Sequence, residues 1–310
     1  MHSTESTITN LSGRSSGYRV QEIVNSHLST PGKFIRPRII ELFGKLFDLE
    51  REKQLLISRS AELIHTASLI HDDVVDEADL RRGQRTLHKK TSNSQAVLAG
   101  DFLLARVIGE LVTAGEYEIL KTISEALEDI VEGEFLQDQL KKKGTNSKEE
   151  LIEVSRKKTG ALLAWCCSSV AKVSNASEEV IRKCHLFGEK IGVAFQMIDD
   201  NLDFSDISGK DKNKDLKDGL INFTTLNLLK NYPELFYIVH QMRSTPCDAV
   251  PWNEIQIETA LKETRHEVDV ILNEAKKLFN EISQTTSTSN IVEITEEVFH
   301  FIDQIKERTK

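Results

Sequence analysis

Two acidic segments, DDVVD at 72–76 and DDNLD at 199–203, hold the residues best suited to chemistry in this chain. On a helix, the first and last aspartate of each D-D-x-x-D pattern project from one face. Like charges at that spacing repel, and anions near a helix C-terminus oppose the helix dipole, so we expect a cation to offset them. Carboxylate oxygens suit Mg²⁺, which is usually held by a few carboxylates together with substrate phosphates. One segment alone would equally fit a solvated helix end, but two copies, each after an apolar helix, favour a metal site.

Basic residues supply what such a metal site would need to bind a phosphate ligand. They lie in the segments GKFIRP (32–37), RRG (81–83) and KTG (158–160), and at Lys210 after the second acidic segment. Each of these residues taken alone is usually a solvated charge. Together with the acidic segments they predict a diphosphate site, in which metal ions bridge phosphate oxygens and arginine forks bind them bidentately.

Long helices are the elements that must position these residues. The chain has only 15 glycines and 5 prolines in 310 residues. This is about half the usual share, and it argues against sandwiches, barrels and propellers, which need frequent turns. Apolar residues at helical spacing predict helices at 55–78, 96–112, 123–143 and 180–204. Ser147 and Glu150 predict a capping box, and no strand is predicted, so the expected fold class is all-α.

The chain is expected to form one large domain. Residues 1–18 are polar and without apolar period, which predicts a disordered N-terminal tail, so the domain would span 19–310. The highly charged segment 205–222 also lacks an apolar period, and it is predicted to be a mobile loop and a candidate lid.

Composition excludes several classes of protein. A net charge of -9 argues against a general nucleic-acid binder, and no apolar run approaches the length of a membrane span. Four cysteines without a CxxC pair favour buried thiols in a reducing compartment. No secretory signal is visible. We therefore expect an intracellular, soluble protein, and the Ser/Thr-rich start with Arg14 and Arg19 leaves mitochondrial and cytoplasmic locations both open.

Six motifs follow one another in an order that resembles the trans-isoprenyl diphosphate synthase (polyprenyl synthetase) family. From about residue 20 to the C-terminus they read GKFIRP, LIHDDVVDEADLRRG, AVLAGDFLLAR, GEFLQ, KKTG and FQMIDDNLDF. The resemblance implies a single helical bundle of the isoprenoid synthase type around a deep central cavity, with the two acidic segments facing each other across its mouth. It also implies a homodimer as the common assembly.

The resemblance assigns roles to the matching residues. Several Mg²⁺ ions would bind with the allylic diphosphate. Their principal ligands would be Asp72, Asp76 and Asp199, and their supporting ligands Asp73, Asp200 and Asp203. The allylic diphosphate would be bound by Arg81, Lys158, Gln196 and Lys210, and Thr159 would also bind substrate. Isopentenyl diphosphate would be bound by Lys33, Arg36, His65 and Arg82. The residues expected to be catalytic are Asp72, Asp76, Asp199, Lys158 and Lys210.

The chemistry that the family implies is a prenyl transfer. Metal ions and cationic side chains stabilise the leaving diphosphate, and the allylic C–O bond ionises. The double bond of isopentenyl diphosphate attacks the carbocation, and the departing diphosphate takes the proton that is lost. Water must be excluded, because it would quench the carbocation.

One position departs from the family pattern. The family often reads D-x-x-x-G-K after the second acidic segment, whereas this chain reads DLKDGL at 215–220 and has Leu220 in place of the lysine. A leucine there resembles mitochondrial long-chain polyprenyl synthases that make ubiquinone side chains, some of which work with a second, unlike subunit. The resemblance therefore predicts a quinone side chain as the purpose of the product and leaves open a heteromer in which this chain is the catalytic or a regulatory subunit.

Product length is predicted from the residues one turn before the first acidic segment. Ala67 and Ser68 stand where short-chain members of the family place bulky aromatic residues. The family implies that the growing chain runs in a tunnel along this helix, from the first acidic segment toward the helix N-terminus. Small side chains at positions 67 and 68 would leave this tunnel open, so we expect an all-trans product of hexaprenyl to decaprenyl class. Alternatively these two residues only pack, and the floor is formed by Ile64, Phe102 or Phe135, which keeps a farnesyl or geranylgeranyl synthase open.

Two other classes of enzyme match part of the sequence. An HD-type metal phosphohydrolase would use His65, His71 and Asp72, but it would leave the second acidic segment and the basic motifs without a role. A class I terpene cyclase ionises a single diphosphate, so Lys33, Arg36 and His65 would be idle. Consumption of isopentenyl diphosphate distinguishes a synthase from both.

Overall fold

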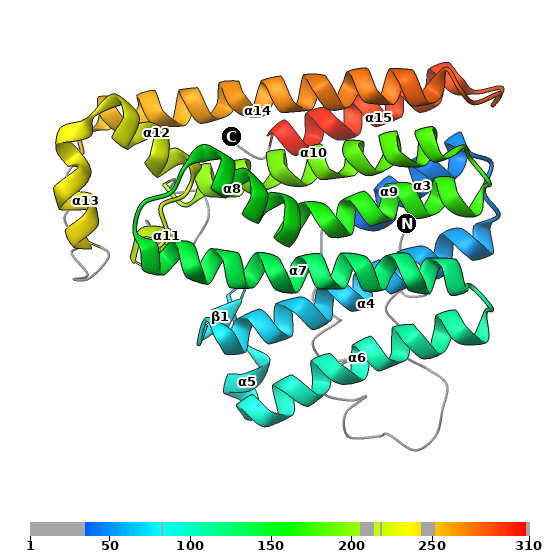
Figure 1. Ribbon diagram of the computed structural model, residues 1–310, viewed down its shortest axis with the longest axis horizontal. Helices are drawn as coiled ribbons and strands as arrows, with labels where there is room; N and C mark the ends of the chain where they lie inside the picture. Colours follow the sequence, from blue (N-terminus) through cyan, green and yellow to red (C-terminus); the bar gives the residue numbers. More distant parts are fainter. Residues whose placement is uncertain (1–34, 82, 205–213, 218, 243–251, 308–310) are drawn as a thin grey trace. The chain divides into compact units, whose positions relative to one another are not determined.

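The computed structural model describes residues 35–81, 83–204, 214–217, 219–242 and 252–307. In Figure 1 the described residues are almost entirely helical, and a small hairpin pairs β1 (Leu80–Arg81) with β2 (Gln84–Arg85). The prediction of an all-α fold is confirmed. The hairpin was not predicted, because two residues in each strand are too few to leave a recognisable alternation. Lys33, Arg82, Lys210 and the predicted tail at 1–18 lie outside the described residues.

Contacts divide the chain into two compact units, Met1–Ile123 and Ser124–Lys310. Each unit is described by itself below, and the single domain at 19–310 stays a prediction. The first unit contains α3 (Ile35–Leu46), α4 (Arg51–Val75), α5 (Leu87–Lys90), α6 (Asn93–Thr113) and the start of α7 (Tyr117–Lys143). Helix α4 packs against α3, α5 and α6. Its residues Ile57, Leu63, Ile64 and Ile70 are fully buried and form the centre of this unit.

The second unit is organised around α10 (Glu178–Leu202), which packs against α9 (Ala161–Val173) and α14 (Glu254–Ser283). Its other elements follow α7 in the order α8 (Lys148–Ser155), the π-turn η1 (Arg156–Gly160), α11 (Lys214–Lys217), α12 (Phe223–Asn231), η3 (Pro233–Leu235), α13 (Phe236–Met242) and α15 (Ile291–Lys306). Figure 1 shows α14 running alongside α10, with α15 beside it.

The ends of the predicted helices are explained by their caps. Helix α4 ends at Val75, three residues before the predicted end, because Glu77 adopts a left-handed conformation with φ 51°. Its amide bonds to the carbonyl of Val74 and the amide of Ala78 to that of Asp73, which is a Schellman cap. The predicted capping box of Ser147 and Glu150 is present. Residues 205–213 of the predicted loop at 205–222 lie outside the described residues. Residues 214–217 form α11, a helix of one turn, so the loop prediction was wrong there.

Cys166, Cys167 and Cys184 are buried free thiols, as predicted. Burial raises the pKa of Cys184 to about 12 and also raises the pKa of Cys167. These thiols are therefore protonated at neutral pH and behave as small apolar side chains. Within the described residues, no helix combines the length and apolarity needed to cross a membrane.

A partly buried ion cluster joins α4 to α6 and supports a pH-dependent stability prediction. Arg59 Nε lies 2.8 Å from one oxygen of Glu110, and Arg106 Nε lies 2.7 Å from the other. Burial raises the pKa of Glu110, but the two arginines outweigh burial, so the pKa lies below its ordinary value. The charge of Glu110 therefore stabilises the fold above the ordinary glutamate pKa, and this contribution is lost as pH falls through the lower folded value.

We expect Glu110→Gln to lower the free energy of unfolding by about 2 kcal/mol at neutral pH, since it leaves two arginines without their anion. Urea unfolding at pH 7 and at about pH 3 measures this. The difference in the free energy of unfolding between wild type and variant should be smaller at the lower pH. Glu258→Gln is the control, because Glu258 pairs with Lys262 in solvent. A gap that is the same at both pH values would contradict the account.

Candidate active site

The first acidic segment forms the C-terminal end of α4. Asp72 and Asp73 lie in its last turn, and Asp76 is the C-cap, with its amide bonded to the carbonyl of Asp72. Asp76 is exposed and Asp72 partly exposed, whereas Asp73 is only 1% exposed. The cap thus presents two of the three carboxylates toward solvent and holds the third inside the first unit.

Arg81 lies beside this buried carboxylate. Its Nε donates to Asp73 Oδ1 at 2.7 Å, from the β1 strand of the hairpin, which turns at Gly83 with φ 75°. The other oxygen, Asp73 Oδ2, is buried with no hydrogen-bond partner. The structure therefore brings together Asp73, which is predicted to bind metal, and Arg81, which is predicted to bind diphosphate. Since a guanidinium has five N–H groups, Arg81 keeps donors for a phosphate.

Arg36 of α3 contacts α4 within the same unit. Its Nη1 is 3.5 Å from Glu62 Oε1, and its Nε is buried with no hydrogen-bond partner. His65 lies one turn after Glu62 on α4 and is partly buried. Glu62 was not predicted as a site residue, because a glutamate on an apolar helix gives no signal without its partner.

His71 fixes the spacing of α4 and α6 just before the first aspartate. A Cβ added to Gly100 of α6 would lie 2.2 Å from His71 Nε2, so a larger residue at position 100 would require the His71 side chain to move. The same ring nitrogen lies 3.1 Å from the carbonyl oxygen of Val97. These contacts make His71 part of the helix packing in this structure.

The predicted chain-length residues differ in exposure. Ala67 is 1% exposed and Ile64 fully buried, whereas Ser68 is partly exposed and donates to the carbonyl of His65 at 2.9 Å. Phe102 is partly buried on α6, and Phe135 on α7 is 66% exposed. Ser68 is therefore the better of the two positions at which to test product length, because a larger side chain there does not have to displace a packed core.

The second acidic segment forms the end of α10 in the second unit. Asp199 is partly exposed in the last turn, and Asp203 is the C-cap. Asp203 is 8% exposed and accepts from the amide of Asp215 at 3.3 Å. Helix α11 is thereby tied to the end of α10.

Asp200 is 4% exposed, and both of its oxygens are hydrogen-bonded. Oδ1 accepts from Gln196 Nε2 at 3.0 Å, and Oδ2 accepts from the amide of Phe223 at 3.0 Å. Burial, then the charge of Asp215, raises the pKa of Asp200 well above its ordinary value, and these two hydrogen bonds act in the opposite direction. Negative charge is thus costly at this end of α10, and a cation would relieve it.

Gln196 connects the second acidic segment to the KTG motif. Its Oε1 accepts from Thr159 Oγ1 at 3.1 Å, and its amide nitrogen donates to Asp200. Thr159 lies in the π-turn, a type of turn that is frequent at functional sites. Three predicted site residues from two motifs, KKTG and FQMIDDNLDF, are therefore joined within one unit.

Lys158, in the same turn, points to α7. Its Nζ lies 2.6 Å from Glu134 Oε1 and donates to Gln137 Oε1 at 2.9 Å. Neither residue was assigned a role from the sequence, although both belong to the GEFLQ motif. The ammonium is thus held in place by side chains of α7.

Glycines set the distance between the π-turn and α10. A Cβ on Gly192 would lie 2.4 Å from the Cα of Gly160, which is backbone and cannot move aside cheaply. We expect Gly192→Ala to lower the free energy of unfolding by about 2–3 kcal/mol, measured by urea unfolding, because the two backbones must separate. Gly109→Ala is the control, since nothing lies within 4 Å of its added Cβ. Equal effects of the two substitutions would contradict the account.

Leu220, the departure from the family pattern, follows the end of α11. Gly219 has φ 85°, and the amide of Leu220 donates to the carbonyl of Asp215 at 2.8 Å. Asp215 in turn accepts from Asn222, which caps α12. Residue 220 takes part in this cap through its backbone amide, and its side chain is partly buried.

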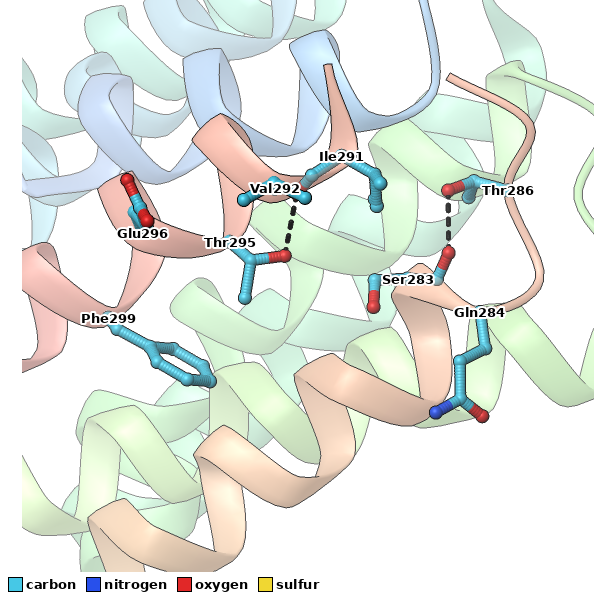
Figure 2. A pocket seen from close by; sticks show the side chains of 8 residues that line it. All are labelled: Ser283, Gln284, Thr286, Ile291, Val292, Thr295, Glu296 and Phe299. Atoms are coloured by element: carbon cyan, nitrogen blue, oxygen red, sulfur yellow. Dashed lines mark hydrogen bonds between the residues drawn. The ribbon is translucent and has the colours of Figure 1, made fainter. Parts of the chain in front are cut away.

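A hollow of about 550 Å³ lies elsewhere, where α14 ends and α15 begins. Figure 2 shows its lining of polar, acidic and apolar side chains: Ser283, Gln284, Thr286, Ile291, Val292, Thr295, Glu296 and Phe299. It contains no lysine, arginine or predicted site residue, so it does not fit a diphosphate. In the described part of the chain, no three His, Cys, Asp or Glu side chains gather closely enough to hold a metal by themselves. Mg²⁺ does not require this, because substrate phosphates and waters usually complete its shell.

Comparisons with known proteins agree with this picture. The family model described as polyprenyl synthetase matches residues 18–248. An all trans-polyprenyl-diphosphate synthase of Homo sapiens is 30% identical over 288 residues, which is 89% of this chain and 69% of the human protein. A decaprenyl-diphosphate synthase of Dictyostelium discoideum is 31% identical over 281 residues, which is 89% of this chain and 61% of that protein.

Solved structures show the same fold. A decaprenyl diphosphate synthase from Rhodobacter capsulatus superposes with a TM-score of 0.85 at 22% identity, covering 100% of this chain and 96% of that chain. A polyprenyl synthase from Caulobacter crescentus, complexed with calcium and isoprenyl diphosphate, superposes with a TM-score of 0.83 at 23% identity, covering 100% of this chain and 94% of that chain.

Proposed function

Because the chain belongs to the polyprenyl synthetase family, we propose that it is a Mg²⁺-dependent prenyltransferase that makes a long-chain all-trans polyprenyl diphosphate. Its substrates are isopentenyl diphosphate and an allylic diphosphate. Membership of this family favours a synthase over the phosphohydrolase and the terpene cyclase.

One observation carries this proposal. Within the second unit, Thr159, Gln196 and Asp200 form a continuous hydrogen-bonded chain from the KTG motif to the second acidic segment. Lys158 precedes Thr159 in the same turn, and its ammonium is held by Glu134 and Gln137 of α7. The turn therefore offers a hydroxyl that is linked to the second acidic segment, and a cation next to it in the chain. This is the arrangement that a diphosphate bound through metal ions needs, with direct donors on one side and metal ligands on the other.

The carboxylates fit Mg²⁺ on two grounds. Asp73 Oδ2 is buried without a hydrogen-bond partner, and the buried charge of Asp200 lies near that of Asp215. A hard cation would satisfy the unpaired oxygen and offset the charge. The proposed ligands are the six aspartates Asp72, Asp73, Asp76, Asp199, Asp200 and Asp203. Bound Mg²⁺ would supply positive charge to the leaving diphosphate.

The side chains of this chain then bind, orient and stabilise the reactants. Arg81, Lys158, Thr159, Gln196 and Lys210 hold the allylic diphosphate, while Lys33, Arg36, His65 and Arg82 hold isopentenyl diphosphate. Stabilisation of the leaving group lets the allylic C–O bond break, and the double bond of isopentenyl diphosphate then forms the new C–C bond. The released diphosphate accepts the proton, so no side-chain base is needed, and the double bond itself is the nucleophile.

The long-chain product is supported by the relatives, which are named for polyprenyl and decaprenyl diphosphates. A mitochondrial solanesyl-diphosphate synthase of Oryza sativa is also similar, at 31% identity. We propose that the product supplies a quinone side chain, and that the protein acts in the mitochondrion or the cytoplasm.

The proposed assembly is a homodimer. Leu98, Ile108 and Val112 leave apolar side chains 61%, 50% and 44% exposed at helical spacing on α6. Apolar faces of this kind usually mark protein contacts. A heteromer with an unlike synthase subunit is the alternative, favoured by Leu220. Light scattering on the purified chain distinguishes a dimer from a monomer that needs a partner.

The function is tested by following labelled isopentenyl diphosphate with purified chain, Mg²⁺ and farnesyl diphosphate. We expect label to enter an extended product with release of diphosphate, and chelation of Mg²⁺ to abolish it. Formation of a cyclic hydrocarbon without uptake of label would overturn the proposal in favour of a cyclase.

A further inference from the structure

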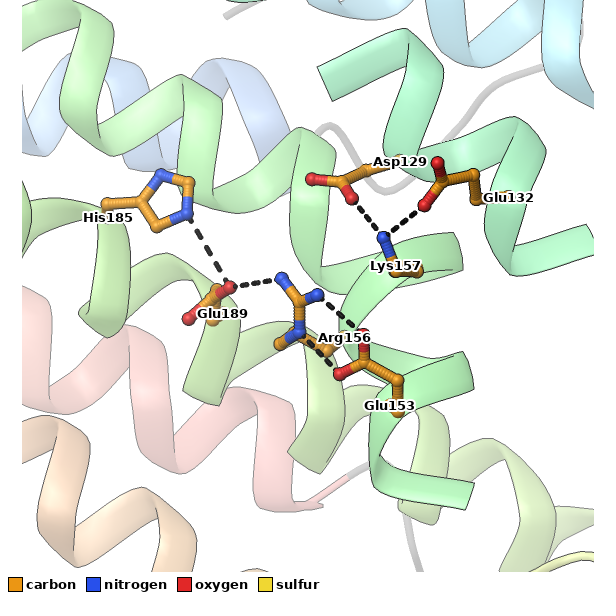
Figure 3. Close-up of polar contacts among 7 residues, drawn as sticks. All are labelled: Asp129, Glu132, Glu153, Arg156, Lys157, His185 and Glu189. Carbon is orange, nitrogen blue, oxygen red and sulfur yellow. Dashed lines mark hydrogen bonds and ion pairs between the residues drawn. The ribbon is translucent and has the colours of Figure 1, made fainter. Parts of the chain in front are cut away.

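The π-turn that carries Lys158 and Thr159 is held from one side by Arg156, its first residue. Figure 3 shows the guanidinium between two carboxylates. Its Nε and Nη2 lie 2.8 and 2.7 Å from the two oxygens of Glu153 on α8, and its Nη1 lies 2.9 Å from Glu189 Oε1 on α10. His185 Nε2 lies 3.5 Å from the same oxygen of Glu189. We refer to these four residues as the Arg156 network.

Lys157, the second residue of the turn, is held by another helix. Its Nζ lies 2.5 Å from Asp129 Oδ1 and 2.6 Å from Glu132 Oε2, both on α7, and its side chain is only 12% exposed. Figure 3 shows these two carboxylates converging on one ammonium. Two consecutive cations of the turn are thus attached to different helices, so the turn cannot rotate about its axis without breaking one set of contacts.

Rotation matters because a π-turn contains one residue more than an α-helical turn. If the segment wound as an α-helix, the side chains that follow the turn in the chain would rotate by about 100° about the helix axis, relative to those that precede it. Thr159 would then lose Gln196, and Lys158 would leave Glu134 and Gln137. Such turns are rare, and this one is fixed at its start by Arg156 and at its end by the approach of Gly160 to Gly192.

All three nitrogens of Arg156 are engaged by Glu153 and Glu189, so its contacts in this arrangement are with the helices that flank the turn. Burial raises the pKa of Glu189, but hydrogen bonds from His185 and Arg156 outweigh burial and lower it. Glu189 is therefore ionised at neutral pH and can hold the arginine.

From this geometry we propose that the Arg156 network and Lys157 are positioning residues, which keep the π-turn in place so that Lys158 and Thr159 meet the allylic diphosphate. The inference rests on the proposed function, since it assigns those two residues to that substrate.

The test uses Arg156→Met and Glu189→Gln, with Glu274→Gln as the matched control. Glu274 pairs with Lys190 of α10 but does not touch the π-turn. We expect both test variants to raise KM for the allylic diphosphate by about tenfold, because a small displacement of binding groups is costly. KM for isopentenyl diphosphate and all constants of the control should be unchanged.

Amide hydrogen exchange gives a second readout that does not depend on activity. In Arg156→Met, the amides of residues 156–160 should exchange about tenfold faster, while those of α14 keep their wild-type rates. Unchanged exchange in the π-turn, or an equal rise in both KM values, would overturn the inference. Faster exchange with unchanged KM values would overturn the positioning role.

Failure of the proposed function would look different. The wild-type chain would then not elongate any allylic primer, alone or with a partner, whereas the exchange rates would still decide whether the network holds the turn. The KM values and exchange rates of the variants therefore test the positioning role, whereas elongation by the wild-type chain tests the proposed function.

Discussion

Replacing Asp199 with asparagine should lower the rate of prenyl transfer by about 10²–10³-fold and raise the Mg²⁺ concentration needed for half-maximal rate. Asp199 is partly exposed at the end of α10, where the proposed metal ligands gather. The substitution keeps the size of the side chain but removes the charge that would hold the ion. Steady-state rates over a range of Mg²⁺ concentrations measure both effects.

Asp269→Asn is the control for this substitution. Asp269 pairs with Lys306 between α14 and α15 and has no proposed role in catalysis. It should leave the rate and the Mg²⁺ dependence unchanged. If Asp199→Asn behaved like this control, the metal-binding role of the second acidic segment would be rejected.

Replacing Ser68 with phenylalanine should shorten the main product by several isoprene units. The side chain of Ser68 is partly exposed on α4, one turn before Asp72, so an aromatic ring there would occupy space rather than displace a core. Ala67→Phe is less informative, because Ala67 is 1% exposed and overpacking would cost about 1–3 kcal/mol of stability. Chromatography of the dephosphorylated products measures chain length.

Thr66→Phe is the control for product length. Residues 66 and 68 are two positions apart on α4, so their side chains point about 200° apart around the helix. The control should make the wild-type product. Products of equal length from Ser68→Phe and wild type would show that other residues form the floor of the tunnel.

The helices and the acidic segments could be predicted because their signals are local. Helix period, capping residues and the spacing of Asp199 to Asp203 all lie within one turn or one helix, where geometry follows from sequence. The capping box at Ser147 was found for the same reason. The order of the motifs then indicated the family, which the comparisons confirm, whereas the roles of the matching residues stay predictions.

The remaining features depend on partners that are distant in sequence. Arg156 and Glu189 are 33 residues apart, and Thr159 and Gln196 are 37 apart, so their pairing follows only from the packing of the helices. The π-turn has no composition of its own, since RKKTG could equally continue an α-helix. The partner of Asp73 was hidden in the same way, because the hairpin that brings Arg81 back to it is only two residues long in each strand.

The length of the product made by the purified chain tests the central claim most directly. Labelled isopentenyl diphosphate, Mg²⁺ and farnesyl or geranylgeranyl diphosphate are incubated with the chain, and the products are separated by length. The account predicts polyprenyl diphosphates of hexaprenyl to decaprenyl class. Products that stop at geranylgeranyl diphosphate, or no elongation either alone or with a second synthase subunit, would contradict it.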